Sequence, residues 1–493
     1  MEEKGKKEKK LIGKKRNPPK EDLDSSEEKP IKKEEKNNST LSQELKEMEE
    51  RNKKFIEKCE FHPIKFIPPE TCEVHPETKA LKFEVVSTFN RARAGILTLP
   101  HGKVLTPVYM PVGTKGAMKG LLSCDLERME CKLMLSNTYH LALEPGDAFL
   151  NKNYGGSEKR GIHNYMKWSN NVLTDSGGFQ IVSLSKLSVR SENGVEFVSH
   201  IDGDDRKIIL TPEKSMSIQN NIGSDIMMAF DDVIRPTSNI NEIYDACERS
   251  LRWIDRCIKS HKRKKEQNLF GIIQGGLDLN LRKIAVEEMN KRNLPGYAIG
   301  GMAGGESKND FWKVVNTCTD YLPENKPRYL MGVGYPVDLV ICSLLGVDMF
   351  DCVFATRTAR FGTAFTNNGF IKLKNQKFKF DFNPIEIECD CEVCQKYTKS
   401  YFYYMFNKNP RAVVLISFHN VYYLLNLMKK VRNSIIQGNV NDFVKDFFMK
   451  QFPDSTPSWI RDALKKAGVN IDFIEKVDDR IFYGDNITDE EDE

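Results

Sequence analysis

The stretch Phe270-Gly271-Ile272-Ile273-Gln274-Gly275 is an apolar run that ends in one polar side chain and a glycine. Runs of this kind recur through the body of the chain, each ending in glycines or in one polar residue. They span residues 134–137, 172–178, 226–231, 297–301, 329–332 and 349–351. Strands that are buried on both faces, as in a parallel sheet, have this near-continuous apolar character. The runs therefore predict the strands of a parallel sheet.

Helix-like stretches separate these runs, at residues 241–262, 279–292 and 308–321. Repeated strand–helix alternation is typical of an α/β fold. Successive strand ends lie about 20 to 55 residues apart, which suits a (β/α)8 TIM barrel, where polar residues at the carboxyl ends of the strands meet at one mouth. A doubly wound sheet is the structural alternative. It would need a glycine-rich phosphate loop after the first strand, and no G-x-G-x-x-G motif occurs there.

The composition is that of a globular protein. Of 493 residues, 40% are hydrophobic and 29% are charged, which supplies enough apolar material for a large core. No stretch approaches the roughly 20 apolar residues that a membrane-spanning helix needs, and the start of the chain lacks the features of a signal or transit peptide. We therefore expect a cytoplasmic protein without a membrane span. Its 12 cysteines are expected to be reduced thiols or metal ligands.

Charge is distributed unevenly along the chain. Residues 1–60 carry a net charge of +2 and residues 471–493 a net charge of −8, which leaves +10 on residues 61–470. A basic body suggests a polyanionic partner, although an ordinary solvated surface explains it equally well.

A metal site is indicated by Cys389-x-Cys391-x-x-Cys394, which is followed by His419. Three thiolates and one imidazole complete the tetrahedral shell that zinc prefers, and they leave no position for a reactive water. We therefore expect a structural zinc ion. The alternative is that three free thiols lie close in sequence by chance.

These features predict four regions. Residues 1–60, rich in lysine and glutamate, cannot bury enough apolar surface to fold, and we expect a disordered charged extension there. Residues 80–385 are expected to form the catalytic (β/α)8 barrel, and residues 386–452 a zinc-binding subdomain with closing helices. Residues 453–493 are expected to be an acidic C-terminal tail.

Three carboxylates end predicted strands: Asp175, Asp231 and Asp351. Two aspartates that face each other across a barrel mouth can divide the work of breaking a glycosidic bond, one attacking the anomeric carbon and the other moving protons. A single strand-end aspartate is more often the N-cap of the next helix. Three in the same context favour chemistry, but the pattern alone does not decide.

Glycine pairs at residues 177–178, 275–276, 300–301 and 304–305 indicate either tight turns or backbone that approaches a flat ligand. Gln274 offers a side-chain amide that can pair with the edge of a base. Phe179 and Met331 supply apolar faces that can sandwich an aromatic ring, although both are equally compatible with the core.

At these residues the sequence resembles the tRNA-guanine transglycosylase family, also called queuine tRNA-ribosyltransferase, over about residues 83–452. The motifs that carry the resemblance lie at residues 136–141, 174–180, 200–203, 225–231, 331–334 and 348–353, together with the Cys3His set. The family is a zinc-bearing (β/α)8 barrel, which agrees with the fold predicted above.

The resemblance implies an enzyme that exchanges guanine-34 in the anticodon of GUN tRNAs (those for Asp, Asn, His and Tyr) for queuine, by double displacement through a covalent Asp–ribose intermediate. It implies that Asp351 is the nucleophile and Asp175 the proton acceptor. The implied base-binding residues are Ser176, Gly177, Gly178, Phe179, Asp231, Gln274, Gly301, Met331, Val233 and Gly304. The implied RNA-binding residues are Gly332, Thr356, Arg357 and Arg360, and the implied zinc ligands are Cys389, Cys391, Cys394 and His419.

Val233 and Gly304 imply the choice of substrate. The bacterial members of the family, which insert the smaller preQ1 base, have a cysteine and a valine at these positions. Glycine in place of valine removes an isopropyl group where the cyclopentenediol of queuine would project, which points to a eukaryote-type enzyme.

Such an enzyme works with a homologous non-catalytic subunit that typically lacks the catalytic aspartates, and a homodimer is the other possible assembly. A catalytically silent tRNA-binding subunit is therefore the alternative function. Asp175 and Asp351 favour the enzyme. A barrel glycoside hydrolase is a third class, but it has no use for a base sandwich.

Overall fold

Eight parallel strands form one sheet in the computed structural model, which describes residues 66–155, 161–178, 188–201 and 204–479. The strands are β4 (Val108–Met110), β5 (Leu133–Ser136), β6 (Asn171–Thr174), β10 (Ile226–Met228), β11 (Asn268–Ile273), β12 (Gly296–Ile299), β13 (Arg328–Leu330) and β14 (Met349–Asp351). Their order is β4-β14-β13-β12-β11-β10-β6-β5, and a parallel bridge between Val112 and Leu135 joins the two ends. The sheet closes into the predicted barrel, so the doubly wound alternative is wrong.

The barrel strands follow from their unbroken apolar sequence. Every residue of β5, β6, β10, β11, β12 and β13 is buried, because one face of each strand fills the barrel and the other packs under the helices. Met228, Phe270, Ile272 and Tyr329 belong to one interior cluster.

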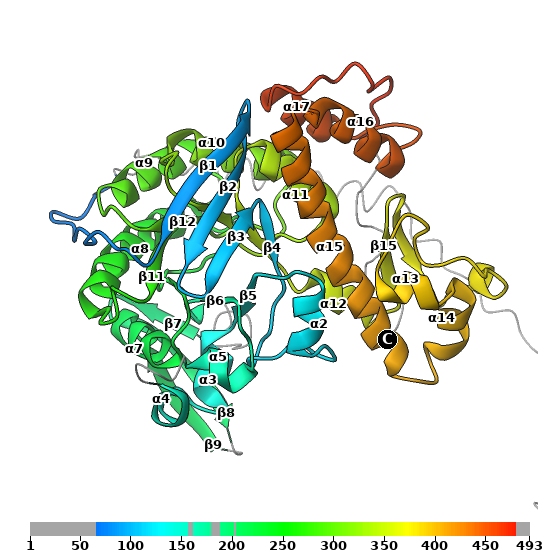
Figure 1. Cartoon of the computed structure of the whole chain (residues 1–493). Coiled ribbons are helices and arrows are strands. Elements are labelled where there is room, and N and C mark those ends of the chain that lie inside the picture. Colours follow the sequence, from blue (N-terminus) through cyan, green and yellow to red (C-terminus); the bar gives the residue numbers. More distant parts are fainter. Residues whose placement is uncertain (1–65, 156–160, 179–187, 202–203, 480–493) are drawn as a thin grey trace, which may run out of the picture. The chain divides into compact units, whose positions relative to one another are not determined.

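An antiparallel sheet of β1 (Lys82–Phe89), β2 (Ala92–Leu99) and β3 (Gly102–Thr106) precedes the barrel. Its residues Leu97 and Val104 pack into the same cluster as the barrel interior. Figure 1 shows β1–β3, in blue, lying across the barrel strands. This sheet is the floor of the barrel, at the end where the strands begin.

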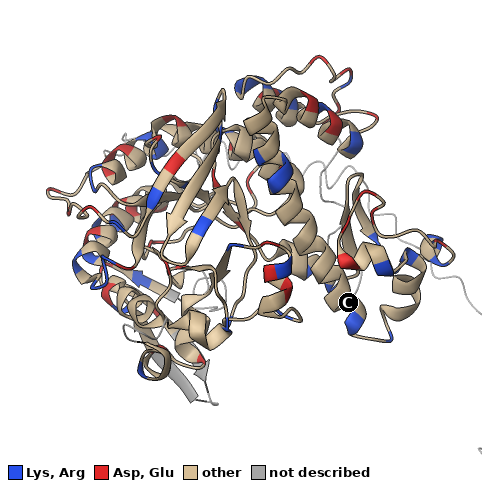
Figure 2. Ribbon diagram, in the orientation of Figure 1, with Lys and Arg blue, Asp and Glu red and all other residues tan. Residues whose placement is uncertain are grey.

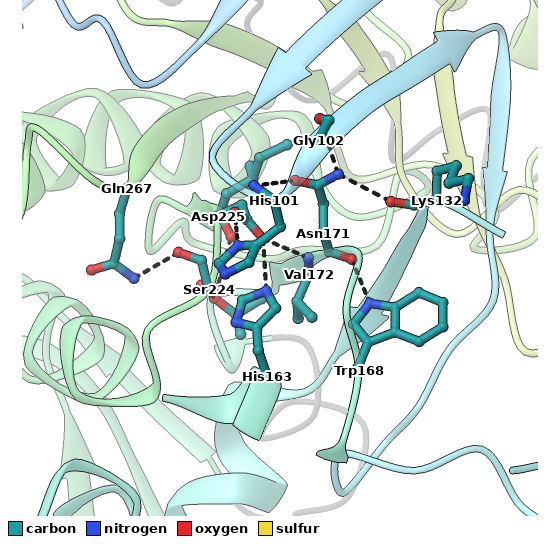
Figure 3. A network of polar contacts seen from close by, with 12 residues as sticks. His101, Gly102, Lys132, His163, Trp168, Asn171, Val172, Ser224, Asp225 and Gln267 are labelled. Atoms are coloured by element: carbon teal, nitrogen blue, oxygen red, sulfur yellow. Dashed lines mark hydrogen bonds and ion pairs between the residues drawn. The ribbon is translucent and has the colours of Figure 1, made fainter. Parts of the chain in front are cut away.

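Asp225, which immediately precedes β10, fastens the floor to the barrel (Figure 3). The Nδ1 of His101, in the turn between β2 and β3, lies 2.6 Å from Asp225 Oδ1. The Nε2 of His163, in α5 (Ile162–Met166), lies 2.9 Å from Oδ2, and the Val172 N–H donates to the same oxygen at 2.8 Å. Burial opposes ionisation of Asp225, but the hydrogen bonds and charges of the two histidines hold its pKa below its usual value.

The three helices expected between the strands are confirmed as α8 (Ile240–Ser260), α9 (Leu279–Asn290) and α10 (Lys308–Tyr321). The other helices around the barrel are α2 (Ser123–Arg128), α3 (Thr138–Leu143), α4 (Asp147–Tyr154), α5, α7 (Pro212–Ile222) and α11 (Pro336–Leu344). Between β6 and α7 the chain adds an antiparallel sheet of β7 (Ser188–Ser191), β8 (Gly194–Ile201) and β9 (Asp204–Leu210).

Figure 2 shows basic and acidic residues interspersed along α8, α9 and α10, as on an ordinary solvated surface.

The region that follows the last barrel strand contains the expected metal ligands. It comprises α12 (Phe354–Ala359), the hairpin of β15 (Thr363–Thr366) and β16 (Gly369–Lys372), the short η1 (Gln376–Phe378), α13 (Glu392–Lys396), α14 (Lys399–Met405) and α15 (Arg411–Gln437). The long helix α15 packs against α12 and β15, and also against β1, β2 and β4. One helix therefore joins this region to the barrel (Figure 1).

The chain ends differently from the expected tail. After α16 (Val440–Gln451), residues 458–466 form α17 (Ser458–Lys466), whose Ile460, Ala463 and Leu464 are buried. This helix packs on α10 and α11. Its apolar face was hidden in the sequence by the acidic residues that follow it. The expected extension at residues 1–60 and the last residues of the tail lie outside the described residues. Within the described ranges, every helix falls short of the length or the apolar character that a membrane crossing requires.

Candidate active site

Two aspartates end barrel strands at the same mouth of the barrel. Asp351 is the last residue of β14, and Asp175 follows β6 directly. Tyr329, on β13, lies near both of them. Burial raises the pKa of the Tyr329 phenol well above its usual value, and the charge and hydrogen bond of Asp351, followed by the charge of Asp175, raise it further. The structure thus brings the two predicted catalytic carboxylates together at the carboxyl ends of the strands.

Asp351 receives its hydrogen bonds at one oxygen. Tyr329 Oη donates to Oδ1 at 2.5 Å, and the Gly332 N–H donates to the same atom at 2.8 Å. Burial raises the pKa of Asp351, and these two donors oppose the rise because they stabilise the carboxylate. Oδ2 accepts no hydrogen bond from a described residue.

Asp175 is buried and is oriented by the loop that follows β5. The Thr138 N–H donates to Oδ1 at 2.8 Å, and Asn137 Nδ2 donates to Oδ2 at 2.5 Å. Both donors belong to the motif at residues 136–141 that the sequence analysis singled out. Two donors on different oxygens fix the plane of the carboxylate.

Asp231, Gln274 and Ser176 form a polar edge beside these carboxylates. Gln274 Nε2 donates to Asp231 Oδ2 at 2.7 Å, and Ser176 Oγ lies 3.4 Å from Oδ1. Burial raises the pKa of Asp231 to about 6. The hydrogen bond from Gln274 opposes this rise, and the neighbouring charge of Asp232 adds to it. Gln274 Oε1 is buried and finds no partner among the described residues. Because buried acceptors are normally hydrogen-bonded, this oxygen indicates a place for a donor of a ligand.

The predicted glycines bring backbone up to this edge. Gly301 has φ +67°, and a Cβ added there would lie 2.3 Å from Gln274 Oε1. A side chain at this position would therefore displace the Gln274 amide. Gly177 has φ +84°, and the Gly178 N–H donates to Ser176 Oγ at 3.3 Å.

Of the predicted base sandwich, the structure describes one side. Met331 directly follows β13, is half-buried and packs against the interior cluster. Phe179 lies outside the described residues.

The two positions expected to set the size of the pocket lie on loops in close proximity. A Cβ added to Gly304 would lie 2.8 Å from Pro236 Cδ, in the loop that also carries the half-buried Val233. The Gly304 and Ala303 N–H groups donate to the Glu306 carboxylate at 2.9 and 2.7 Å. Glu306, which the sequence did not suggest, therefore holds the loop of Gly304 in place.

The expected RNA-binding residues gather on and beside α12, directly after Asp351. Arg357 and Arg360 are exposed, and neither forms an ion pair with an acidic side chain of the described residues. Thr356 Oγ1 donates to the Val353 carbonyl at 3.1 Å. Gly332 lies at the same mouth but gives its N–H to Asp351. The two guanidinium groups are therefore accessible to phosphates.

The Cys3His set forms one cluster in which the four ligand atoms lie within 4.8 Å of one another. His419 Nδ1 lies 3.8, 3.6 and 3.3 Å from the sulfurs of Cys389, Cys391 and Cys394. Such separations suit four ligands that each lie about 2.0–2.3 Å from one ion. His419 Nε2 lies 2.8 Å from the Phe365 carbonyl, to which it can donate only as the tautomer that leaves Nδ1 free to bind metal. The cluster can hold a metal ion.

Sequence reasoning missed Tyr329, which contacts Asp351. Tyr329 belongs to an apolar run and is buried inside the barrel, so its pattern predicted a core residue. The only signal in the sequence was its hydroxyl, because a buried tyrosine usually finds a hydrogen-bond partner.

Comparison with known proteins matches most of the chain to one family. The family model described as "Queuine tRNA-ribosyltransferase" matches residues 88–453, a segment that contains every predicted site residue. The chain belongs to the queuine tRNA-ribosyltransferase family. It is 50% identical over 407 residues to the queuine tRNA-ribosyltransferase catalytic subunit of Schizosaccharomyces pombe, a match that covers 80% of this chain and 98% of that protein.

Two further relatives extend the comparison. The queuine tRNA-ribosyltransferase catalytic subunit of Caenorhabditis briggsae is 46% identical over 409 residues, which cover 80% of this chain and 100% of that protein. The queuine tRNA-ribosyltransferase of a Thermoanaerobacter species is 44% identical over 374 residues, which cover 75% of this chain and 98% of the bacterial protein. The family match and these relatives identify the chain as a tRNA-ribosyltransferase.

Proposed function

We propose that this chain exchanges guanine-34 of GUN tRNAs for queuine by double displacement at Asp351. The observation that carries the proposal is the placement of Asp351 and Asp175 at one barrel mouth, beside the polar edge of Asp231 and Gln274. Two carboxylates can break and remake a glycosidic bond, and an amide beside a carboxylate can recognise the donors and acceptors of a purine edge.

In the first displacement, Asp351 Oδ2 attacks C1′ of the ribose. The bond from C1′ to the guanine N9 breaks, its electron pair leaves with the base, and a proton supplied through Asp175 neutralises the departing guanine. The product is a covalent ester between Asp351 and the ribose.

In the second displacement, Asp175 accepts the proton from N9 of the incoming queuine. That nitrogen attacks C1′, and the Asp351 carboxylate leaves with the electron pair of the ester bond. The two hydrogen bonds to Oδ1 from Tyr329 and Gly332 stabilise this carboxylate as a leaving group.

The base is bound by its edge and by its faces. Asp231, Gln274 and the Gly301 N–H recognise the edge, with Ser176, Gly177 and Gly178 beside them, and Phe179 and Met331 stack on the two faces. The base must leave the anticodon stack to enter this pocket. Arg357 and Arg360, with Thr356 and the backbone at Gly332, anchor the neighbouring phosphates.

We assign a structural zinc ion to Cys389, Cys391, Cys394 and His419. The donor set is the one that zinc prefers, and the hydrogen bond of His419 to Phe365 orients the imidazole for it. When bound, the ion supplies folding energy to this region and takes no part in the base exchange.

Queuine is preferred over preQ1 in this proposal because Val233 and Gly304 leave room for the cyclopentenediol. The chain then acts as the catalytic subunit in the cytoplasm, with a homologous non-catalytic subunit or a second copy as its partner. The silent tRNA-binding subunit is disfavoured because Asp175 and Asp351 are both present, and both relatives quoted from eukaryotes are named catalytic subunits.

The test is the exchange of radiolabelled guanine, and of queuine, into tRNA with a GUN anticodon, with and without the partner. Wild-type protein is expected to incorporate guanine and to release it again when queuine is added. Asp175→Asn and Asp351→Asn are expected to incorporate neither. Wild-type protein that binds tRNA but exchanges no base in any combination would identify the silent subunit instead.

A further inference from the structure

We propose that Arg282 is a positioning residue for base recognition, which acts by polarising the peptide group between Gly300 and Gly301. The inference rests on the proposed function, in which the Gly301 N–H faces the base. Arg282 lies in a helix-like stretch of the sequence, and the double displacement above does not use it.

Arg282 lies behind the base edge, on α9, and is fully buried. Its Nη1 donates to the Ile273 carbonyl at 2.8 Å and to the Gly300 carbonyl at 2.9 Å. Its Nε donates to the Gly276 carbonyl at 2.9 Å. Ile273 ends β11, and Gly276 and Gly300 lie in the loops that follow β11 and β12, which carry Gln274 and Gly301. One guanidinium group therefore links the segment that carries Gln274 to the segment that carries Gly301.

The charge of Arg282 is unusual for a buried side chain. No carboxylate of the described residues forms an ion pair with it, and burial lowers its pKa, although the charges of Cys318, Cys247 and Glu306 oppose this lowering. A buried cation without a counter-ion is costly to the fold. Neutral side chains can also bind carbonyls, so the positive charge itself needs a reason.

The reason that we infer lies on the far side of the peptide group. The Gly300 carbonyl and the Gly301 N–H share one resonant amide. A charge-assisted hydrogen bond to the oxygen draws electron density away from the nitrogen, which makes the N–H a stronger donor. Gly301 is half-buried, and its N–H finds no acceptor among the described residues. The Gly300 N–H, in contrast, donates to the Ile273 carbonyl at 3.0 Å. The polarised N–H is thus left for a ligand acceptor.

The acceptor that fits is the 6-carbonyl oxygen of guanine or of the queuine ring system. Because Gln274 Oε1 would lie only 2.3 Å from a Cβ at position 301, the Gln274 amide and the Gly301 backbone can address one edge of a single base. Arg282 then strengthens the hydrogen bond to that oxygen and leaves other contacts of the base unchanged.

The test compares two bases that differ in this oxygen. Guanine has the 6-oxygen and the N1–H that accompanies it, whereas 2-aminopurine lacks both and keeps the 2-amino group and N9. The quantity that tests Arg282 is therefore the change that one variant causes for each base, and not the difference between the two bases in wild-type protein. In the exchange reaction we would measure the KM for guanine, the Ki of 2-aminopurine and the KM for tRNA, for wild-type protein and for Arg282→Lys. Lysine keeps a charge and an alkyl stem but cannot reach three carbonyls at once. Asn290→Ala, at the last residue of the same helix, is the control.

Arg282→Lys is expected to raise the KM for guanine by about tenfold, the loss that follows when a charge-assisted hydrogen bond is replaced by a weaker one. The Ki of 2-aminopurine and the KM for tRNA should change little. If the KM for guanine and the Ki of 2-aminopurine rise equally, Arg282 only shapes the loops. If neither rises, the charge of Arg282 does not affect binding of the base. Both results would overturn the inference.

A second variant guards against misfolding. Arg282→Ala should regain its KM for guanine when guanidinium is added, but not when ammonium is added at the same ionic strength. If neither variant folds, the amide proton of Gly301 in glycine-labelled wild-type protein should resonate downfield of that of Gly305, and equal shifts would overturn the inference. Wild-type protein that exchanges no guanine would overturn the proposed function itself, whatever the variants do.

Discussion

Tyr329 donates its phenolic hydrogen to Asp351, with Oη 2.5 Å from Oδ1. The donor comes from β13 and the acceptor from the neighbouring strand β14. Adjacent strands of a barrel hold their side chains in fixed register, so this bond orients the carboxylate before any substrate arrives. Both hydrogen bonds that Asp351 accepts from the described residues go to Oδ1, and none goes to Oδ2.

Tyr329→Phe removes that donor and should raise the pKa of Asp351 further, because the hydrogen bond now stabilises the ionised form. The acid limb of the pH–rate profile should therefore move to higher pH, and the rate near neutral pH should fall by about tenfold. Single-turnover exchange across the pH range measures both effects. Tyr297→Phe, on β12, is the control because Tyr297 is equally buried. An acid limb that stays in place would show that the tyrosine does not act on the nucleophile.

The lowered pKa of Asp225, at the barrel floor, should make the stability of the protein depend on pH. Its pKa is lowered in the folded protein from a usual value of 3.8, so the stability that it contributes is present above that value and is lost as the pH falls through the folded pKa. Urea unfolding of wild-type protein should therefore show a loss of free energy of unfolding on acidification below about pH 4. Asp225→Asn should be less stable at neutral pH and should show a shallower acid loss. Equal slopes for the two proteins would contradict the assignment.

Removal of one zinc ligand should unfold one region. Wild-type protein is expected to contain one tightly bound zinc ion per chain, and Cys391→Ala should lose both the ion and the protection of residues 385–425 against proteolysis. Metal analysis and limited proteolysis measure the two effects. Cys124→Ala, at an exposed cysteine of α2, is the control. Wild-type protein without zinc would refute the site.

Gly304 tests the choice of base. An added isopropyl group in a filled pocket forces strain of about 1–3 kcal/mol, so Gly304→Val should lower kcat/KM for queuine and spare guanine, which does not reach that corner. The ratio of the two kcat/KM values is the quantity to measure. Because a Cβ there already meets Pro236, Gly304→Ala is the control for movement of the loop. If Gly304→Val lowers kcat/KM equally for queuine and guanine, Gly304 acts only through the position of that loop.

The sequence predicted the barrel because its strands are apolar on both faces, as the run at residues 270–275 illustrates. It did not predict β4, because Met110 at its end is followed by a proline and not by the glycine or polar residue that marks the other strands. The floor was also missed, because His101 and Asp225 lie 124 residues apart and only the folded chain brings them together. Local sequence pattern predicts strands and helices. Long-range hydrogen bonds cannot be predicted from it, because the topology of the fold determines which distant residues meet.

The site divides in the same way. Asp175, Asp231, Asp351 and the zinc ligands were predictable because charged or ligating residues interrupt apolar runs or have a typical spacing. Tyr329 and Arg282 were not, because the first is compatible with a core strand and the second with the surface of a helix. Arg282 is buried only because α9 turns it toward the loops after β11 and β12.

In the proposed reaction, Asp351 forms the covalent bond to the ribose. Wild-type protein incubated with GUN tRNA and quenched by denaturation should yield an RNA–protein adduct, and mass spectrometry should locate the nucleoside on the peptide that contains Asp351. Asp351→Asn should yield no adduct while its affinity for tRNA stays nearly unchanged, because that affinity rests mainly on phosphate contacts. A denaturation-resistant adduct in Asp351→Asn would show that another residue is the nucleophile.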